Sequence, residues 1–320
     1  MHTTAYIRHN VYMIYDVIII GGGPAAIAAA VYTARKKLKT LLITESFGGQ
    51  SIVSAEIYNW IGTKTISGIQ LAKNLEDHVR NFPDDVTITM PELATGIVKE
   101  GGVFTVTTDK DGSYQAKTIV VASGAARKKL GIPGEKEFDG KGVVYCSTCD
   151  APIFSGQDVA VVGGGNAGLE AVVDLLPYAK TIYLLEYSDS VKGDPSTQEK
   201  IAQKDNVMLL LNAETKKVTG EQFVTGLVYH DTKSGEEKTL SVGGVFVEVG
   251  SVPNSGFVKD LVELNEHGEI VIDHKTAGTS LPGIYAAGDV TDEMYKQNNI
   301  SAGDGVKAAL SAYQYILNNT

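Results

Sequence analysis

Cys146 and Cys149 are the only two cysteines of the 320-residue chain, and two residues separate them. A Cys-x-x-Cys pair can be a redox dithiol, half of a zinc site or a structural disulfide. Two glycine-rich fingerprints of the kind that binds dinucleotides flank the pair, one near the start of the chain and one beginning at Gly163, fourteen residues after Cys149. Two nucleotide sites around one dithiol are the arrangement needed to pass electrons from one cofactor, through a second, to a disulfide.

Zinc binding is the main competing explanation of the cysteine pair. A structural zinc ion takes four ligands, usually cysteine and histidine. The six histidines are scattered without ligand spacing, at positions 2, 9, 78, 230, 267 and 274. We therefore expect no metal site, and the pair is interpreted as a redox dithiol in a reducing compartment.

The first fingerprint is Gly21-x-Gly23-x-x-Ala26, directly after a predicted strand and at the start of a predicted helix. In such a loop one glycine permits the tight turn, the next lets the backbone approach a pyrophosphate, and the small third residue lets helix and strand pack closely. The helix N-terminus offers free N–H groups to the phosphates. Glu45 follows Gly23 by 22 residues, where it can accept a hydrogen bond from a ribose hydroxyl.

The second fingerprint is Gly163-x-Gly165-x-x-Gly168, and Glu186 lies 21 residues beyond Gly165. A glycine-rich turn without a ligand is the alternative at both loops, since the glycine spacing alone is a weak signal. The preceding strand, the following helix and the acidic residue at the proper distance favour nucleotide binding in both cases.

The residues around Glu186 favour NADH over NADPH in the second site. A carboxylate repels the 2′-phosphate of NADP, whereas arginines nearby would attract it. Between Glu186 and Lys192 the chain contains only uncharged or acidic residues, so Lys192 is the single basic residue of this segment.

The predicted secondary structure repeats one βαβ unit, and such duplication indicates two related domains. The first unit consists of a strand at Tyr15–Ile20, a helix at Pro24–Lys37 and a strand at Thr40–Ile43; the second consists of a strand at Asp158–Val162, a helix at Asn166–Leu176 and a strand at Thr181–Leu185. A meander is predicted after each unit, at Gly102–Thr108, Ser113–Gln115 and Thr118–Ala122, and again at Phe223–His230, Thr239–Leu240 and Gly244–Val249, with a polar turn at 231–237. A last helix is predicted over residues 301–317.

We predict an α/β fold of two Rossmann-like, three-layer ββα dinucleotide-binding domains, the second inserted into the first. Residues 1–126 and 253–320 are expected to form the first domain, for FAD, and residues 127–252 the second, which carries the dithiol and binds NAD(P)H. The segments 122–127 and 250–254 resemble hinges between them. Residues 1–13 show no pattern and are expected to form a short extension.

Composition excludes several other classes of protein. The net charge of -10 argues against nucleic-acid binding, which needs a basic face. The apolar run at 11–30 superficially resembles a signal peptide, but Asp16 interrupts it and the three glycines that follow explain it better as a strand entering a nucleotide loop. No stretch reaches the roughly 18 apolar residues needed to span a bilayer, and the protein is expected to be cytoplasmic, with no membrane partner.

Taken together, the motifs resemble the low-molecular-weight thioredoxin reductase family from about residue 14 to the end. The resemblance rests on Gly-Gly-Gly-Pro-Ala-Ala (21–26), Gly-Gly-Gln (48–50), Asn-Trp (59–60), Ala-Ser-Gly-Ala (122–125), Cys-Ser-Thr-Cys-Asp (146–150), Gly-Gly-Gly-Asn-Ala-Gly (163–168), Ala-Gly-Asp (287–289), Lys-Gln (296–297) and Ser-Ala-Gly-Asp-Gly (301–305). Within the family, the second half is most similar to the reductase portion of the F subunit of alkyl hydroperoxide reductase. The segments 184–188, 212–215, 295–297 and 309–313 fit that NADH-linked branch.

The resemblance implies FAD in the first domain and a nicotinamide cofactor in the inserted one. The residues it assigns to FAD are Gly21, Gly23, Pro24, Ala25, Glu45, Gly49, Gln50, Asn59, Gly288, Asp289, Lys296, Gln297 and Asn298. Those it assigns to the nicotinamide cofactor are Gly163, Gly165, Asn166, Ala167, Glu186 and Lys192. It also implies a homodimer and a large domain rotation between flavin reduction and dithiol exchange.

Two departures from the family bear on donor and acceptor. The His-Arg-Arg-x-x-x-Arg pattern of the NADPH-linked members falls here on Glu186, Tyr187, Ser188 and Lys192. The chain has no room for the extra N-terminal dithiol module that the alkyl hydroperoxide reductase branch carries, so a separate thioredoxin- or glutaredoxin-like protein is expected as the electron acceptor.

By resemblance, Cys149 is the sulfur next to the flavin and Cys146 the one that attacks the disulfide of the partner. Thiol–disulfide exchange needs a proton donor and acceptor, and no histidine lies near the motif, so Asp150 is the expected group. An apolar cleft can raise the pKa of such a carboxyl toward the working range. The alternative for Asp150 is a solvated turn or helix-cap residue.

Three other functions are compatible with the same fold. The protein could take electrons from reduced ferredoxin instead of a nicotinamide, as some relatives without the arginine pattern do, although the intact second fingerprint argues against this. It could be a non-enzymatic flavin redox sensor. NADH oxidation with hydrogen peroxide as product is a conceivable side activity that would need neither cysteine.

Overall fold

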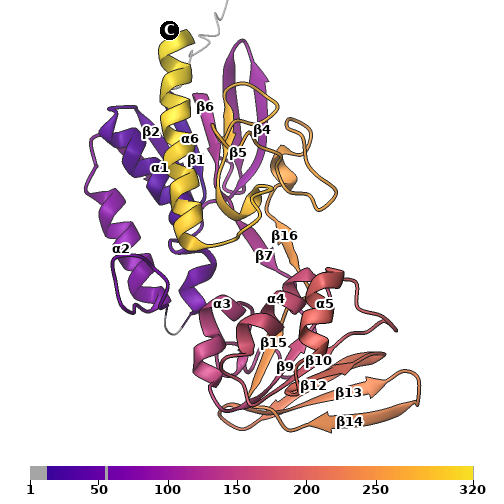
Figure 1. Ribbon diagram of the computed structural model, residues 1–320. Helices are drawn as coiled ribbons and strands as arrows, with labels where there is room; N and C mark the ends of the chain where they lie inside the picture. Colours follow the sequence, from indigo (N-terminus) through magenta and orange to yellow (C-terminus); the bar gives the residue numbers. More distant parts are fainter. Residues whose placement is uncertain (1–12, 55–56, 320) are drawn as a thin grey trace, which may run out of the picture. The chain divides into compact units, whose positions relative to one another are not determined.

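The computed structural model describes residues 13–54 and 57–319. The short extension predicted for residues 1–13 lies outside the described residues except for Met13, which is exposed and precedes the first strand. Of the described residues, 13–54, 60–126 and 253–319 form one compact unit, and 57–59 and 127–252 form another. We call these the first and the second unit (Figure 1).

The first unit is built on one sheet of seven strands in the order β3-β2-β1-β6-β5-β4, with β17 paired to β6. Its strands are β1 (Ile14–Ile20), β2 (Thr40–Ile43), β3 (Val86–Thr89), β4 (Ala94–Glu100), β5 (Val103–Thr108), β6 (Ser113–Val121) and β17 (Ile284–Ala286). Strands β3, β2, β1, β6 and β17 are joined by parallel pairing, whereas β5 and β4 add to β6 as antiparallel strands.

Both faces of this sheet are buried, which explains the continuous apolar run of β1. Val17 and Ile19 face α1 (Pro24–Arg35) and α6 (Asn298–Asn319), which lie side by side in Figure 1. The alternate residues Ile18 and Ile20 pack on the opposite face, in a cluster with Phe104. A parallel strand covered on both faces needs apolar side chains at every position. A further helix, α2 (Gly68–Arg80), packs against α1.

The second unit contains a parallel sheet in the order β11-β10-β9-β15-β8 and a separate antiparallel sheet in the order β12-β13-β14. The parallel strands are β8 (Val143–Val144), β9 (Asp158–Val162), β10 (Thr181–Leu185), β11 (Val207–Leu210) and β15 (Gly244–Val247). The antiparallel strands are β12 (Ala213–Gly220), β13 (Val224–Asp231) and β14 (Glu236–Leu240). The helices are α3 (Ser147–Asp150), α4 (Asn166–Leu175) and α5 (Pro195–Ala202).

The α/β fold with two nucleotide-binding units is confirmed, but both meander predictions are wrong in part. Ser113–Gln115 and Thr118–Ala122 form one continuous strand, β6, which pairs with β1 in parallel. Lys117, between the two predicted strands, forms an ion pair of 2.7 Å with Asp16 of β1. Gly244–Val249 is likewise not a meander strand, because its ordered part, β15, pairs in parallel with β9.

Several element boundaries also differ from the prediction. The first helix ends at Arg35 because Lys37 takes a positive φ of 60°. The helix predicted over 301–317 extends over Asn298–Asn319, and the polar turn at 231–237 is shortened by β14, which begins at Glu236. The two predicted hinges each contain a short strand, β7 (Ala125–Arg127) and β16 (Ser251–Pro253), and these pair with each other.

Over the described part of the chain, none of the helices combines the length and the apolar character needed to cross a membrane.

Candidate active site

The two fingerprint loops have the same backbone shape. Gly21 and Gly163 end their strands at positive φ angles of 129° and 117°. A Cβ on Gly21 would lie 2.1 Å from the carbonyl oxygen of Ala122, and one on Gly163 would lie 2.5 Å from that of Glu248. Each glycine is therefore required by the protein's own packing, because the chain bends there against a neighbouring strand end.

Gly23 and Gly165 are glycines that the protein itself does not need. Their φ and ψ angles are -83° and -175° at Gly23 and -82° and -175° at Gly165, an extended conformation open to any residue. A Cβ on Gly165 would meet nothing within 4 Å, and one on Gly23 would meet only the Cα of Gly49, at 3.8 Å. These loops thus leave room for an added Cβ at the start of α1 and of α4, where the free N–H groups of a helix N-terminus lie.

The residues that follow each loop are placed differently. Pro24 and Ala25 open α1 and are buried, so only their backbone is available to a ligand. Asn166 and Ala167 open α4 and are exposed, and the Asn166 side chain accepts a hydrogen bond of 2.8 Å from the backbone N–H of Asp194.

Glu186 binds the second fingerprint loop directly. One carboxylate oxygen accepts a hydrogen bond of 2.7 Å from the backbone N–H of Gly164, and the other accepts one of 2.9 Å from the N–H of Ser188 and one from its hydroxyl. Burial acts to raise the pKa of Glu186, but the bonds from Ser188 and Gly164 and the nearby charge of Lys192 outweigh it and lower this pKa. Glu186 is therefore ionised at neutral pH, and its first oxygen retains the capacity to accept from a ribose hydroxyl.

Three of the residues predicted to bind FAD lie close to the first loop. The backbone of Gly49, at a positive φ of 58°, approaches Gly23 so closely that a Cβ there would lie 3.3 Å from the Gly23 Cα. A Cβ on Gly288 would lie 3.1 Å from the Cβ of Ala25, so the turn that carries Asp289 packs on the start of α1. Asp289 accepts a hydrogen bond of 3.2 Å from the Ser301 hydroxyl.

Other predicted FAD residues already have partners within the protein. The Gln50 side chain donates to the Ala125 carbonyl, and Asn298 accepts a hydrogen bond of 2.8 Å from the Ser51 hydroxyl. Glu45 differs from them, because its side chain is exposed just after the end of β2. Gln297 accepts a backbone hydrogen bond of 2.8 Å from Ser301.

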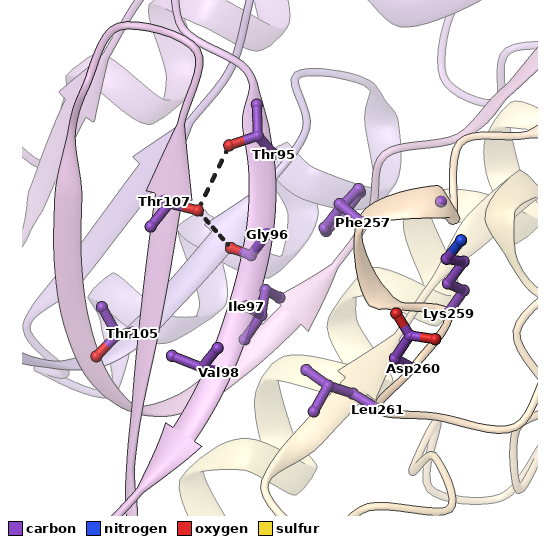
Figure 2. A pocket seen from close by; sticks show the side chains of 11 residues that line it. Thr95, Gly96, Ile97, Val98, Thr105, Thr107, Phe257, Lys259, Asp260 and Leu261 are labelled. Carbon is purple, nitrogen blue, oxygen red and sulfur yellow. Dashed lines mark hydrogen bonds between the residues drawn. The ribbon is translucent and has the colours of Figure 1, made fainter.

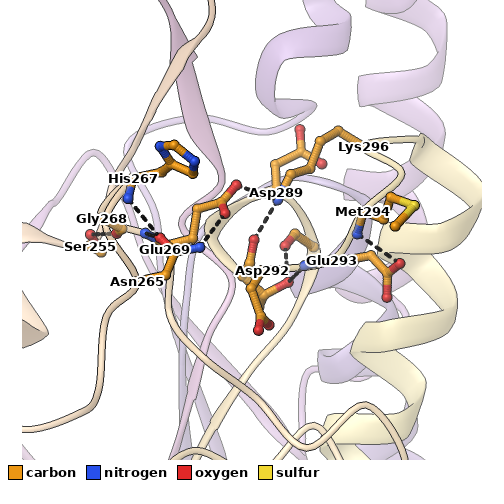
Figure 3. A network of polar contacts seen from close by, with 12 residues as sticks. Ser255, Asn265, His267, Gly268, Glu269, Asp289, Asp292, Glu293, Met294 and Lys296 are labelled. Atoms are coloured by element: carbon orange, nitrogen blue, oxygen red, sulfur yellow. Dashed lines mark hydrogen bonds and ion pairs between the residues drawn. The ribbon is translucent and has the colours of Figure 1, made fainter. Parts of the chain in front are cut away.

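Lys296 is held by a polar network rather than pointing to open space (Figure 3). Its ammonium forms an ion pair of 3.0 Å with Glu269 and donates to the Thr291 carbonyl. Glu269 in turn accepts a hydrogen bond of 2.7 Å from the Asn265 side chain. The Lys296 side chain thus fixes the segment after Asp289, and a direct contact with FAD stays a prediction. Asn59 groups with the second unit, and its contact with FAD stays a prediction.

Cys146 and Cys149 form a disulfide, with their Cα atoms 5.4 Å apart. The two residues between them, Ser147 and Thr148, belong to the short helix α3. Both of their hydroxyls donate hydrogen bonds to Asp174 of α4, of 2.9 Å from Ser147 and 3.0 Å from Thr148. Asp150 ends α3, and burial raises its pKa to about 6. A carboxyl with this pKa can both take up and release a proton near neutral pH.

Two acidic residues next to the dithiol were missed from the sequence. Asp174 accepts hydrogen bonds from the hydroxyls between the cysteines, and the carboxylate of Glu248 lies near enough to the backbone N–H of Ser147 for that group to act on its pKa. Glu248 is 8% exposed, and burial raises its pKa to about 7 although the charge of Arg127 and the Ser147 N–H act to lower it. The one sequence signal was a charged residue within the apolar run 244–249, at a strand end where buried carboxylates are rare.

A separate groove of about 350 Å³ lies in the first unit between β4, β5 and the turn at 256–258 (Figure 2). The charged residues that line it are Lys259 and Asp260. The lining includes none of the predicted site residues, so this groove is not part of the candidate site.

Among the residues described, no group of three or more His, Cys, Asp or Glu side chains could hold a metal ion.

Comparison with known proteins agrees with the sequence motifs. A family described as pyridine nucleotide-disulphide oxidoreductase matches residues 15–309. The F subunit of alkyl hydroperoxide reductase in Staphylococcus aureus is 44% identical over 305 residues, which are 95% of this chain and 60% of that protein. A protein called NADH dehydrogenase from Bacillus subtilis is 42% identical over 305 residues, 95% of this chain and 59% of its own length.

A solved structure matches the whole architecture. Thioredoxin reductase from Streptococcus pyogenes superimposes with a TM-score of 0.89 at 34% identity, covering 95% of this chain and 99% of that one. The chain therefore spans about three-fifths of the length of the two curated relatives but nearly all of a thioredoxin reductase. The predicted resemblance to thioredoxin reductases, and among them to the reductase portion of the alkyl hydroperoxide reductase branch, is confirmed.

Proposed function

This chain belongs to the pyridine nucleotide-disulphide oxidoreductase family, and from that premise we propose that it is a flavin-dependent disulfide reductase. Electrons pass from NADH through FAD to the Cys146–Cys149 disulfide, and from there to a thioredoxin- or glutaredoxin-like protein. The observation that carries the proposal is the disulfide itself, formed within the unit that holds the second fingerprint and flanked by a carboxyl of raised pKa.

The first unit is proposed to hold FAD, which would supply a two-electron carrier between nicotinamide and disulfide. The open face of Gly23 supports this, because an added Cβ would meet no protein atom closer than 3.8 Å. Its proposed ligands are the N–H groups at the start of α1, the exposed Glu45, and the turn at 288–289, which packs on that helix. Gly49, Gln50, Asn59, Lys296, Gln297 and Asn298 are proposed to complete the site.

The second unit is proposed to bind NADH at Gly163, Gly165, Asn166 and Ala167. The ionised Glu186 supports NADH over NADPH, since a carboxylate fixed beside Gly164 would repel a 2′-phosphate at the ribose position. Lys192 offers one exposed positive charge, fewer than the arginine set of the NADPH-linked pattern.

Thiol–disulfide exchange then transfers the electrons to the partner. The Cys146 thiolate attacks one sulfur of the partner's disulfide, which forms a mixed disulfide and releases the other sulfur as a thiolate. Cys149 next attacks the Sγ of Cys146, which restores the internal disulfide and releases the second partner thiol. Each cycle consumes one NADH and one proton and reduces one disulfide to two thiols.

The test is anaerobic stopped-flow in the visible absorption band of the flavin, mixing the purified protein with NADH and, separately, with NADPH. Fast bleaching by NADH and slow bleaching by NADPH is the expected result. Faster bleaching by NADPH would contradict the argument from Glu186 and leave the reductase proposal standing. If neither nicotinamide bleaches the flavin, the proposal fails and reduced ferredoxin becomes the donor to test.

Replacing Asp150 with asparagine should slow disulfide reduction by roughly 100-fold, the usual contribution of a positioned acid–base group. The ionised carboxylate accepts the thiol proton, and its population rises with pH through the pKa of about 6. The wild-type rate of thioredoxin reduction should therefore rise across that range, and the rise should be absent from D150N.

The matched control for D150N is D205N, an exposed aspartate of the same unit. It should retain the wild-type rate and pH profile. If D150N keeps the rise near pH 6, Asp150 is a helix-end residue without a role in proton transfer.

A further inference from the structure

Sheet register places Glu248 beside the dithiol. Strand β15 pairs in parallel with β8, with Val245 opposite Val143 and Phe246 opposite Val144. Glu248 directly follows β15, and Cys146 lies two residues beyond β8, so both come just after the carboxyl ends of neighbouring strands. The two strands end at the same edge of the sheet, because the carboxyl ends of neighbouring parallel strands lie together.

The contacts of Glu248 tie it to the peptide that follows Cys146. The Ser147 N–H lies near enough to its carboxylate to act on its pKa, and its own N–H donates a hydrogen bond of 2.9 Å to the carbonyl of Val162, the last residue of β9. The backbone of Glu248 is therefore fixed by pairing with β9, and its side chain is buried, at 8% exposed.

The charged groups around Glu248 come from two elements. Arg127 of β7 acts to lower its pKa, whereas Asp174 and Glu170 of α4 act to raise it. Burial is the largest influence and sets the pKa at about 7. Glu248 thus changes its charge within the range in which thiols exchange, close to the residue that follows Cys146.

We propose that Glu248 is a positioning residue of the dithiol, which holds the Cys146–Ser147 peptide and, when ionised, disfavours the Cys146 thiolate by like-charge repulsion. The inference deepens the proposed reductase function, in which Cys146 is the sulfur that attacks the partner. When Glu248 is protonated it carries no charge, so this repulsion of the Cys146 thiolate is absent. The reactivity of Cys146 should therefore rise less steeply with pH than that of an ordinary thiol.

The test measures Cys146 alone, in a C149S background that leaves one thiol in the chain. Iodoacetamide alkylation of C149S and of C149S/E248Q is followed by mass spectrometry between about pH 5.5 and pH 9. Glutamine can still accept from the Ser147 N–H but carries no charge. A like charge within several ångströms shifts a pKa by about one unit or more, so C149S/E248Q should react up to about tenfold faster at about pH 8.

The pH dependence of this ratio distinguishes charge from structure. Below the pKa of Glu248 the wild-type side chain is neutral, so the two proteins should react at nearly equal rates at about pH 5.5. A ratio that is the same at every pH, or that falls as pH rises, would overturn the proposal. E92Q in the same background is the matched control, because Glu92 is a 6% exposed glutamate of the first unit. It should leave the profile unchanged.

A second measurement covers the case in which E248Q does not fold. In C149S/D150N, which removes the other carboxyl of raised pKa at the dithiol, coupling between Glu248 and Cys146 should spread the alkylation profile over a wider pH range than a single ionisation. A profile that fits one ordinary thiol would overturn the proposal. Neither assay uses NADH or a redoxin, so failure of the reductase proposal and failure of this one are separate results.

Discussion

Replacing Cys146 and Cys149 together with serine should lower the rate of redoxin reduction by at least roughly 1,000-fold while NADH still bleaches the flavin at nearly the wild-type rate. Serine cannot form the mixed disulfide that exchange requires, because only a thiolate attacks a disulfide sulfur and leaves from one. We measure both rates on the same preparation: the reduction of the thioredoxin or glutaredoxin disulfide and the bleaching of the flavin. A variant that has lost FAD is then distinguished from one that has lost only thiol–disulfide exchange.

The single variants separate the two sulfurs. C149S retains Cys146 and should form a stable mixed disulfide with a redoxin, visible by mass spectrometry, because no second thiol is present to resolve it. C146S should form none. The reverse result would exchange the roles assigned to the two cysteines. Undiminished redoxin reduction by the double variant would show that the dithiol is not on the path and would favour plain NADH oxidation.

The fingerprints could be predicted from the sequence because each depends on a short stretch of chain. The strand, the glycine turn and the helix of residues 15–35 follow one another directly, and the short apolar run before Gly21 is best explained as a buried strand. The same holds for residues 158–175. Local patterns of this kind identify a nucleotide loop even before its partners in the fold are known.

The environment of the dithiol could not be predicted in the same way, because it depends on pairing between distant strands. Glu248 is 102 positions from Cys146, and only the parallel register of β15 on β8 brings them together. The apolar run 244–247 is compatible with a meander or a parallel strand, and periodicity does not separate the two. The misassigned strand and the missed carboxylate therefore have one cause.

Lys296 illustrates a second limit, that a motif does not reveal which groups of the protein a motif residue contacts. Its position in the Lys-Gln pair suggested contact with FAD, yet its ammonium binds Glu269 and the Thr291 carbonyl. Side-chain partners of this kind depend on the loop at 265–269, which no motif marks. The glycines are more informative, because their backbone angles and the space around them separate structural from ligand-related positions.

That separation leads to a paired prediction at the first loop. G23A should leave the stability of the protein nearly unchanged, because its extended φ of -83° suits alanine and the added Cβ meets no atom closer than 3.8 Å. The methyl group would instead enter the space proposed for the pyrophosphate. Overpacking of this kind costs about 1–3 kcal/mol, so FAD should dissociate roughly 10- to 100-fold more readily.

G21A should show the opposite pattern and destabilise the fold itself. Its Cβ would lie 2.1 Å from the Ala122 carbonyl oxygen, at a φ of 129° that alanine rarely adopts, and a loss of more than about 3 kcal/mol is expected. Thermal unfolding of the apoprotein and titration with FAD measure the two effects separately. If G23A binds FAD as tightly as the wild type, the cofactor does not approach this glycine. The open space would then require another explanation, since nothing in the backbone of Gly23 calls for glycine.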